Sequence, residues 1–205
     1  MPTQTFYNLS EEKRQRLIDA AIDEFTERTL REASITNIIK QADIPRGSFY
    51  QYFEDLDDLF FYLIRMFVLN LSEHTLGVFE KTTGDFQVVI AAYADAYIDF
   101  VMGSEKASFY KVIYLNMNSR VTGKIFNSII QSFKDSPIVY SKFEPNSSLN
   151  LKLETTSEYV DLIHFTLSAL NHAISEGFAE GWTIQETKEL FNKRLDWLSY
   201  GVISA

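Results

Sequence analysis

The sequence contains no cysteine, no uninterrupted apolar run of about 18 residues and no glycine-rich phosphate-binding loop. The absence of cysteine excludes disulfides and thiolate metal sites. The absence of a long apolar run, and of an apolar stretch among the first residues, gives no support for a membrane span or a secretory signal. These absences predict a cytoplasmic protein. Because a nucleophile elbow is also missing, we do not expect an enzyme.

Positive charge is also scarce. The 205 residues carry 19 basic and 28 acidic side chains, for a formal net charge of -9. This balance argues against general binding of polyanions, so any contact with nucleic acid must come from a local face. Hydrophobic residues make up 46% of the chain, which is ample for a sizeable core. Carboxylates such as Glu24 and Glu27 lie in charged helix faces, where we expect them to be solvated.

Apolar residues recur at helical spacing along most of the chain, so we expect an all-α protein. Ser10 is a predicted N-cap for a first helix that ends near Arg28, and Ser34 for a second helix that ends at Asp43. Ile44-Pro45 cannot extend the second helix, because the residue before proline avoids the helical region and proline lacks the backbone donor. A third short helix then follows, which gives the outline of a helix-turn-helix.

The third helix has two distinct faces when it is drawn on a helical wheel. Phe49 and Phe53 fall on one face, and Gly47 and Gln51 fall on the opposite one. The flanks between them hold Arg46, Ser48, Tyr50 and Tyr52. This arrangement suits a DNA groove, because glycine permits close approach, glutamine can pair with an adenine edge and the flanking groups can hold phosphates. The alternative is a structural turn with exposed tyrosines.

The stretches EKRQRLIDAAIDEF and SITNIIKQADIPRGSFYQYF resemble the N-terminal domain of the tetracycline-repressor (TetR) family of bacterial transcriptional regulators. The resemblance covers about residues 10 to 60, and the remainder matches only in length and helicity. It implies a homodimer that binds a palindromic double-stranded DNA operator and usually represses transcription until a small molecule releases it. It assigns DNA contact to Ser34, Thr36, Arg46, Gly47, Ser48, Tyr50, Gln51 and Tyr52, and it places Phe49 and Phe53 in the core.

The sequence departs from the family pattern in and after the turn. Asp43 stands where glycine is most common, which aspartate tolerates because it visits the left-handed region more readily than most residues. Pro45 replaces a common serine cap. The acidic run at residues 54–59 stands where many members carry a phosphate-gripping lysine, and residues 1–54 hold seven basic and nine acidic side chains. We therefore expect specific but salt-sensitive DNA binding.

Two domains are predicted: a helix-turn-helix DNA-binding domain at residues 1–54 and a helical ligand-binding and dimerisation domain at residues 55–205. The expected helices of the second domain run from about Asp55 to Lys81, over 85–102, 105–117, 120–134 and 154–180, and from Thr183 onward, with Asp85 and Thr183 as N-caps and a loop at 135–150. The last two helices carry apolar stripes, which composition alone assigns to the core of one chain. The resemblance instead assigns them to a four-helix dimer interface.

Aromatic residues crowd the second domain and are predicted to line a pocket for a small hydrophobic or planar effector. They are Tyr93, Tyr97, Phe100, Phe109, Tyr110, Tyr114, Phe126 and Phe165. The alternative is that these side chains fill the core.

Three histidines, His74, His164 and His172, lie on predicted helices. If His74 met one of the other two across an apolar aromatic cavity, the pair would suit haem iron, and some regulators that resemble this chain sense haem. The alternative is ordinary packed or surface histidines. No resident cofactor or metal is expected, and haem enters only as a candidate effector.

The hypothesis that follows is allosteric repression. A ligand bound beyond residue 55 shifts the helix from Asp55 to Lys81, changes the separation of the two recognition helices and releases the DNA. The alternative from another class is a helical ligand-binding or partner-binding protein that does not bind DNA.

Overall fold

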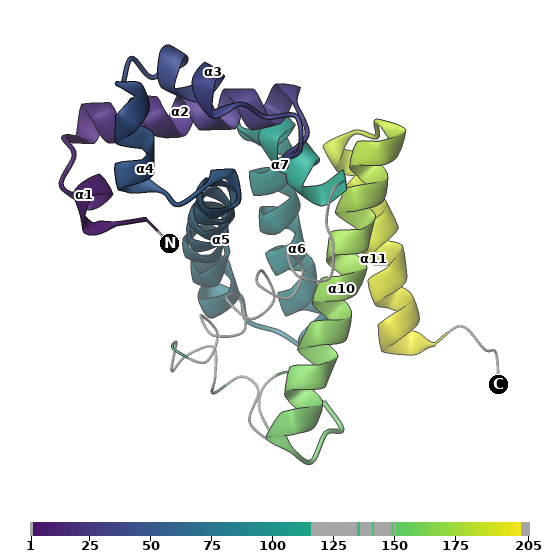
Figure 1. The fold of residues 1–205 in the computed structure, drawn as a ribbon. Helices are drawn as coiled ribbons and strands as arrows, with labels where there is room; N and C mark the ends of the chain where they lie inside the picture. Colours follow the sequence, from purple (N-terminus) through teal and green to yellow (C-terminus); the bar gives the residue numbers. More distant parts are fainter. Residues whose placement is uncertain (1, 116–134, 136–140, 142–148, 150, 202–205) are drawn as a thin grey trace. The chain divides into compact units, whose positions relative to one another are not determined.

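The computed structural model describes residues 2–115, 135, 141, 149 and 151–201, with only the backbone described at Arg46 and Thr156. Every regular element in these residues is helical, which confirms the predicted all-α class (Figure 1). The chain divides into two compact units, Met1–Phe67 and Val68–Ala205.

The first unit contains the predicted helix-turn-helix. Its elements are α1 (Gln4–Tyr7), α2 (Glu11–Glu27), α3 (Ile35–Gln41), the 3-10 turn η1 (Arg46–Ser48), α4 (Phe49–Tyr52) and the first part of α5 (Leu56–Lys81). The predicted ranges of the helices that became α2, α3 and α5 agree closely with these bounds. The short helix α1 was not predicted.

The turn between α3 and the recognition segment follows the sequence prediction. Asp43 has a φ of 52°, in the left-handed region, and the backbone N–H of Ile44 donates to the carbonyl of Ile39 at 3.0 Å. Pro45 precedes η1 directly. The chain therefore reverses within a few residues and presents a new helical segment.

The predicted serine caps are wrong in detail. Ser10 and Ser34 both stand at N-cap positions, but neither side chain accepts a capping hydrogen bond. At Ser34 the backbone N–H instead donates to the carboxylate of Glu24, at 2.8 Å. The start of α3 is therefore held by a side chain from α2.

The boundary between the units falls inside α5, between Phe67 and Val68, whereas the sequence placed it between residues 54 and 55. The first turns of α5 belong to the core of the first unit, because Leu59 and Phe60 are buried there. The ring of Phe60 lies 5.1 Å from the ring of Phe25 in α2.

The second unit consists of the rest of α5 with α6 (Phe86–Gly103), α7 (Ala107–Leu115), α10 (Thr156–Glu180) and α11 (Ile184–Tyr200). These bounds agree with the predicted helices at 85–102, 154–180 and after Thr183, and with the described part of the one at 105–117. The predicted helix at 120–134 and most of the loop at 135–150 lie outside the described residues. Both further caps are confirmed: Asp85 accepts from the N–H of Val88, and Thr183 forms a capping box with Glu186.

The helix α6 is central to the second unit. It packs against α7, α10 and α11. By length and composition alone α6 could cross a membrane, but its Tyr93, Tyr97, Ile98 and Val101 are buried against other helices. That packing is typical of a core helix.

The helices α10 and α11 run antiparallel, side by side (Figure 1), and they approach closely at Gly177. A Cβ atom added at Gly177 would lie 2.3 Å from Oγ1 of Thr187 in α11. Thr187 is fully buried, and its hydroxyl donates to the carbonyl of Thr183 at 3.0 Å. The contact between the two helices therefore requires a residue without a side chain at position 177.

Substituting Gly177→Ala is expected to lower the free energy of unfolding by about 1–3 kcal/mol, because the new methyl group overlaps Thr187. Gly77→Ala in α5 is the matched control. No atom lies within 4 Å of a Cβ added at Gly77, so the better helix propensity of alanine should stabilise that variant by about 1 kcal/mol. Urea denaturation followed by circular dichroism measures both, and changes of the same sign would contradict the close approach.

Candidate functional site

The candidate DNA-reading surface lies on η1 and α4. Phe49 and Phe53 are fully buried beneath it, which confirms the predicted core face. On the opposite side Gly47 and Gln51 are exposed, and Tyr50 is 61% exposed. The outward side therefore carries groups suited to base edges and phosphates.

The other predicted DNA contacts lie in the same unit. Ser34 is half-buried directly before α3, Thr36 is exposed in its first turn and Ser48 is half-buried at the end of η1. Arg46 begins η1, and its side chain lies outside the described residues. The structure therefore brings the start of α3 and the recognition segment together in one compact unit.

The structure places Tyr52 differently from the prediction of DNA contact. Its side chain is only 8% exposed, and its ring lies edge-on to the ring of Phe6 at 6.4 Å. The helix wheel placed Tyr52 on a flank because it could not include α1, which covers that flank. We therefore assign Tyr52 to packing rather than to DNA contact; the sequence signal that was missed is the aromatic pair Phe6-Tyr7 ahead of the first predicted helix.

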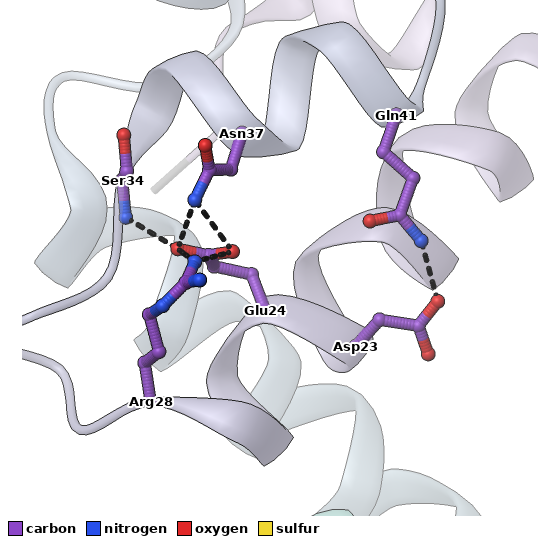
Figure 2. Close-up of polar contacts among 6 residues, drawn as sticks. All are labelled: Asp23, Glu24, Arg28, Ser34, Asn37 and Gln41. Atoms are coloured by element: carbon purple, nitrogen blue, oxygen red, sulfur yellow. Dashed lines mark hydrogen bonds and ion pairs between the residues drawn. The ribbon is translucent and has the colours of Figure 1, made fainter.

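Glu24 is a buried structural residue of this unit, whereas the sequence predicted a solvated carboxylate. It is 4% exposed, and its carboxylate is surrounded by donors (Figure 2). Arg28 donates to both oxygens at 2.9 and 2.8 Å, and Asn37 of α3 donates to both at 3.2 Å. The N–H of Ser34 supplies the fifth hydrogen bond.

The charge state of Glu24 follows from these neighbours. Burial by itself raises the pKa of the carboxyl group, but the hydrogen bonds from Arg28, Ser34 and Asn37 outweigh it and lower the pKa below its ordinary value. Glu24 is therefore ionised at neutral pH and links α2 to the start of α3. At the other end of α3, Gln41 donates to Asp23 at 2.6 Å, so α3 is tied to α2 at both ends (Figure 2).

The acidic run before α5 also has a structural role. The N–H of Asp58 donates to Asp55 at 2.7 Å, and the N–H of Glu54 donates to Asp58 at 3.3 Å. These two carboxylates satisfy donors at the start of α5 and complement its dipole. Residues that oppose DNA phosphates electrostatically are therefore used here as helix caps.

The second unit contains a buried polar cluster, which we call the tyrosine triad: Tyr97, Tyr114 and Asn171. The hydroxyl of Tyr97 donates to Oδ1 of Asn171 at 3.0 Å, and the hydroxyl of Tyr114 lies 2.9 Å from the same oxygen. Burial raises the pKa of Tyr97 to about 12, while its hydrogen bonds with Tyr114 and Asn171 act to lower it. Burial also raises the pKa of Tyr114. The triad is therefore uncharged at neutral pH, and its polar groups bond one another.

The predicted pocket-lining aromatics are mostly packed. Tyr93, Phe109 and Tyr110 are buried, and the half-buried Phe100 stacks on Tyr110 at 5.9 Å. The apolar cavity that Tyr93 helps to line measures only about 10 Å³, room for one water molecule at most. These four aromatic side chains are therefore largely enclosed by neighbouring residues in the described part of the unit.

Two members of the predicted pocket need separate mention. Phe165 is 61% exposed on α10, so it is corrected from a pocket residue to a surface residue. The sequence placed Phe165 on the correct helix, but helical spacing along α10 does not show which side of that helix is exposed. Phe126 lies outside the described residues.

The three histidines lie at the surface of their helices. His74, His164 and His172 are all exposed, and His172 lies 3.2 Å from Glu176 on the surface of α10. Within the described ranges no three histidine or carboxylate side chains gather closely enough to hold a metal ion. The geometry that the haem hypothesis requires, two imidazoles facing each other through an apolar cavity, is not seen among these residues.

Comparison with known families decides what the chain is. The model "Bacterial regulatory proteins, tetR family" matches residues 17–63, and "Tetracyclin repressor-like, C-terminal domain" matches residues 85–202. The chain belongs to the TetR family. It is a DNA-binding transcriptional regulator and not an enzyme, and the predicted resemblance is confirmed.

Two HTH-type transcriptional regulators match parts of the chain. The regulator AcrR of Shigella flexneri is 32% identical over 76 residues, which are 37% of this chain and 35% of AcrR. The regulator YvdT of Bacillus subtilis is 28% identical over 168 residues, covering 71% of this chain and 81% of YvdT. The match to AcrR thus spans about a third of the length of that relative.

Solved structures of transcriptional regulators share the fold. A regulator from Chloroflexus aurantiacus is 25% identical, with a TM-score of 0.53 and 98% of both chains covered. The regulator FadR of Bacillus subtilis, solved in complex with stearoyl-CoA, is 16% identical, with a TM-score of 0.68 over 92% of this chain and 99% of FadR. At this identity the likeness to FadR shows the fold alone.

Replacing Glu24 by glutamine is expected to lower the free energy of unfolding at neutral pH by about 1–3 kcal/mol, because a neutral amide leaves Arg28 and Asn37 with poorly matched partners. Asp23→Asn is the matched control. Asp23 is exposed and bonds the exposed Gln41, so its loss should change stability by less than about 0.5 kcal/mol.

The effect of Glu24→Gln should depend on pH. Because the pKa of Glu24 is lower in the folded chain than in the unfolded chain, its contribution is present above the unfolded value and is lost as pH falls through the folded value. The stability gap between wild type and Glu24→Gln should therefore narrow below the ordinary pKa of 4.5. Denaturation curves across that range measure the gap, and a constant gap would contradict an ionised Glu24 as the source of stability.

Proposed function

We propose that this TetR-family protein is a cytoplasmic repressor that reads a palindromic operator through α4 and is released from it by a small hydrophobic effector. The observation that carries the proposal is the outward side of the recognition segment, formed by Gly47, Tyr50 and Gln51 above a buried pair of phenylalanines. Family membership favours this interpretation over a helical protein without DNA binding.

Base reading is the proposed role of this surface. Gln51 is exposed and carries the amide that can bond an adenine edge bidentately. No atom lies within 4 Å of a Cβ added at Gly47, so the surface there is open to an approaching phosphate or base. Because acidic residues outnumber basic ones in residues 1–54, affinity depends on where the contacts lie and on binding two half-sites at once.

Dimerisation through α10 and α11 is part of the proposal. Arg194 of α11 bonds Glu176 and lies 3.2 Å from His172 on α10, which identifies one shared side of the two helices. Phe165 lies two turns before His172, and Trp197 lies about one turn after Arg194, so both belong to that side. They are 61% and 48% exposed, which is unusual for large apolar side chains and supports their burial against a second copy.

The second unit is the proposed effector domain. The tyrosine triad offers neutral hydrogen-bonding groups within an apolar aromatic layer, which suits a hydrophobic molecule with one polar group. Since the small cavity beside Tyr93 has no room for such a molecule, binding there requires the helices to move apart. The helix α5 runs from the first unit into the second, so a shift of α5 is the proposed route by which the effector changes DNA binding.

Selection of sites from random DNA duplexes tests the reading surface. We expect a palindromic site, and we expect Gln51→Ala and Tyr50→Ala each to cost about 1–3 kcal/mol of affinity for it, because each removes a groove contact. Gln185→Ala, an exposed glutamine of α11, is the matched control and should bind as wild type does. Fluorescence anisotropy measures the affinities; unchanged binding by both recognition variants would refute the assigned surface.

Fluorescence anisotropy also tests whether an effector releases the protein from its operator. A hydrophobic effector should weaken operator binding, and the operator should weaken effector binding by the same factor. Stearyl alcohol is a suitable first probe, since it joins the hydrocarbon chain of the stearoyl-CoA that is bound in the structure of the Bacillus FadR to a single neutral hydroxyl group. Any probe that binds free and operator-bound protein equally well is not an effector.

Substitutions that introduce a charge test the proposed dimer surface. Phe165→Glu and Trp197→Glu should each weaken the dimer by about 2 kcal/mol or more, because each places a carboxylate in an apolar contact. Leu69→Glu is the matched control, since Leu69 is also 48% exposed but lies on α5. Light scattering coupled to size exclusion gives the mass of each variant. If Leu69→Glu dissociated and the other two stayed dimeric, the interface would lie elsewhere.

A further inference from the structure

We infer that residues 3–8, which we call the N-terminal strap, hold the end of the recognition helix in place and thereby set how well the protein distinguishes its operator from other DNA. The inference rests on the proposed role of α4 in DNA reading. It concerns residues that the sequence interpretation did not use.

The first observation is a pair of hydrogen bonds. The backbone N–H of Thr3 donates to the carbonyl of Tyr52 at 2.9 Å, and the hydroxyl of Thr3 donates to the carbonyl of Gln51. These are the last two carbonyls of α4, because the chain leaves the helix at Phe53 with extended dihedral angles. Carbonyls at a helix end have no partner within the helix, so Thr3 supplies donors that α4 lacks.

The second observation is that the Thr3 hydroxyl bonds α4 and not the helix that Thr3 precedes. Thr3 stands at the N-cap of α1, where threonine side chains commonly accept from the helix backbone. Its side chain makes no such bond in α1 and is turned instead to Gln51, far along the chain. The side chain of Thr3 therefore ties the strap to α4 and does not cap α1.

The third observation is the anchor of the strap. Phe6 is fully buried, and its ring meets the ring of Phe53 edge-on at 4.9 Å and that of Tyr62 in α5 at 5.2 Å. The N–H of Phe6 also donates to the carbonyl of Thr3 at 3.1 Å, which fixes the distance between anchor and tie. Phe6 and Thr3 thus grip the same end of α4 from the side chain and from the backbone.

The helix α4 is too short to hold its position without such contacts. The segment from Arg46 to Tyr52 is one 3-10 turn followed by four α-helical residues, which is too short to be stable alone. Base recognition depends on side-chain placement to a fraction of an ångström, whereas phosphate contact is more tolerant. Loosening the end of α4 should therefore weaken operator binding through Gln51 more than it weakens binding to unrelated DNA.

The test compares Thr3→Val with Thr3→Ser in the full-length protein. Valine keeps the shape and the backbone N–H but removes the hydroxyl, and serine retains it. Thr3 is exposed, so neither change should alter the thermal unfolding midpoint greatly. We expect faster amide hydrogen exchange at Tyr52 and Phe53 and about fivefold weaker operator binding in Thr3→Val, from the loss of one hydrogen bond. Binding to unrelated DNA should stay unchanged, and Thr3→Ser should behave as wild type.

Each result decides a different point. Exchange rates that are the same in Thr3→Val and wild type would overturn the strap. Faster exchange together with equal losses for operator and unrelated DNA, or with no loss, would overturn its role in discrimination. If Gln51→Ala leaves operator binding intact while Thr3→Val still exchanges faster, the proposed reading surface fails and the tie between Thr3 and α4 stands.

Discussion

A recognition helix of four α-helical residues cannot hold its own position, and the first unit is arranged around that constraint. Phe49 and Phe53 anchor the helix from beneath, and Phe6 and Thr3 hold its end. The preceding helix α3 is fixed in turn to α2 by the buried carboxylate of Glu24. Remove these supports and the outward groups of α4 would have no defined geometry to offer a DNA groove.

The acidic composition is consistent with this arrangement. Several carboxylates of the first unit are occupied by the fold: Glu24 holds five hydrogen bonds, Asp23 binds Gln41, and Asp55 and Asp58 cap α5. Each of these carboxylates accepts hydrogen bonds within the protein, and Glu24 in addition pairs with the Arg28 cation, which helps to lower its pKa. A DNA-binding unit can therefore carry more acidic than basic residues, provided that the remaining contacts are well placed.

The second unit shows the opposite chemistry. Its interior is apolar and aromatic, and the polar groups of the tyrosine triad satisfy one another. Burial raises the pKa values of both phenols above their ordinary value, so they carry no charge at neutral pH. The helix α5 directly follows the recognition segment in the chain and contributes residues to both units.

The sequence by itself determined the features that depend on neighbouring residues. Helical spacing gave the bounds of α2, α3, α5, α10 and α11, Asp43 and Pro45 gave the turn, and the alternation of Phe49 and Phe53 with Gly47 and Gln51 gave the outward side of α4. The tertiary structure alone decided the burial of Glu24 and Tyr52, the exposure of Phe165 and the end of the first unit within α5. Spacing along one helix shows which residues share a face, but which face is covered depends on segments far away in the chain, such as α1 over Tyr52 and α3 over Glu24.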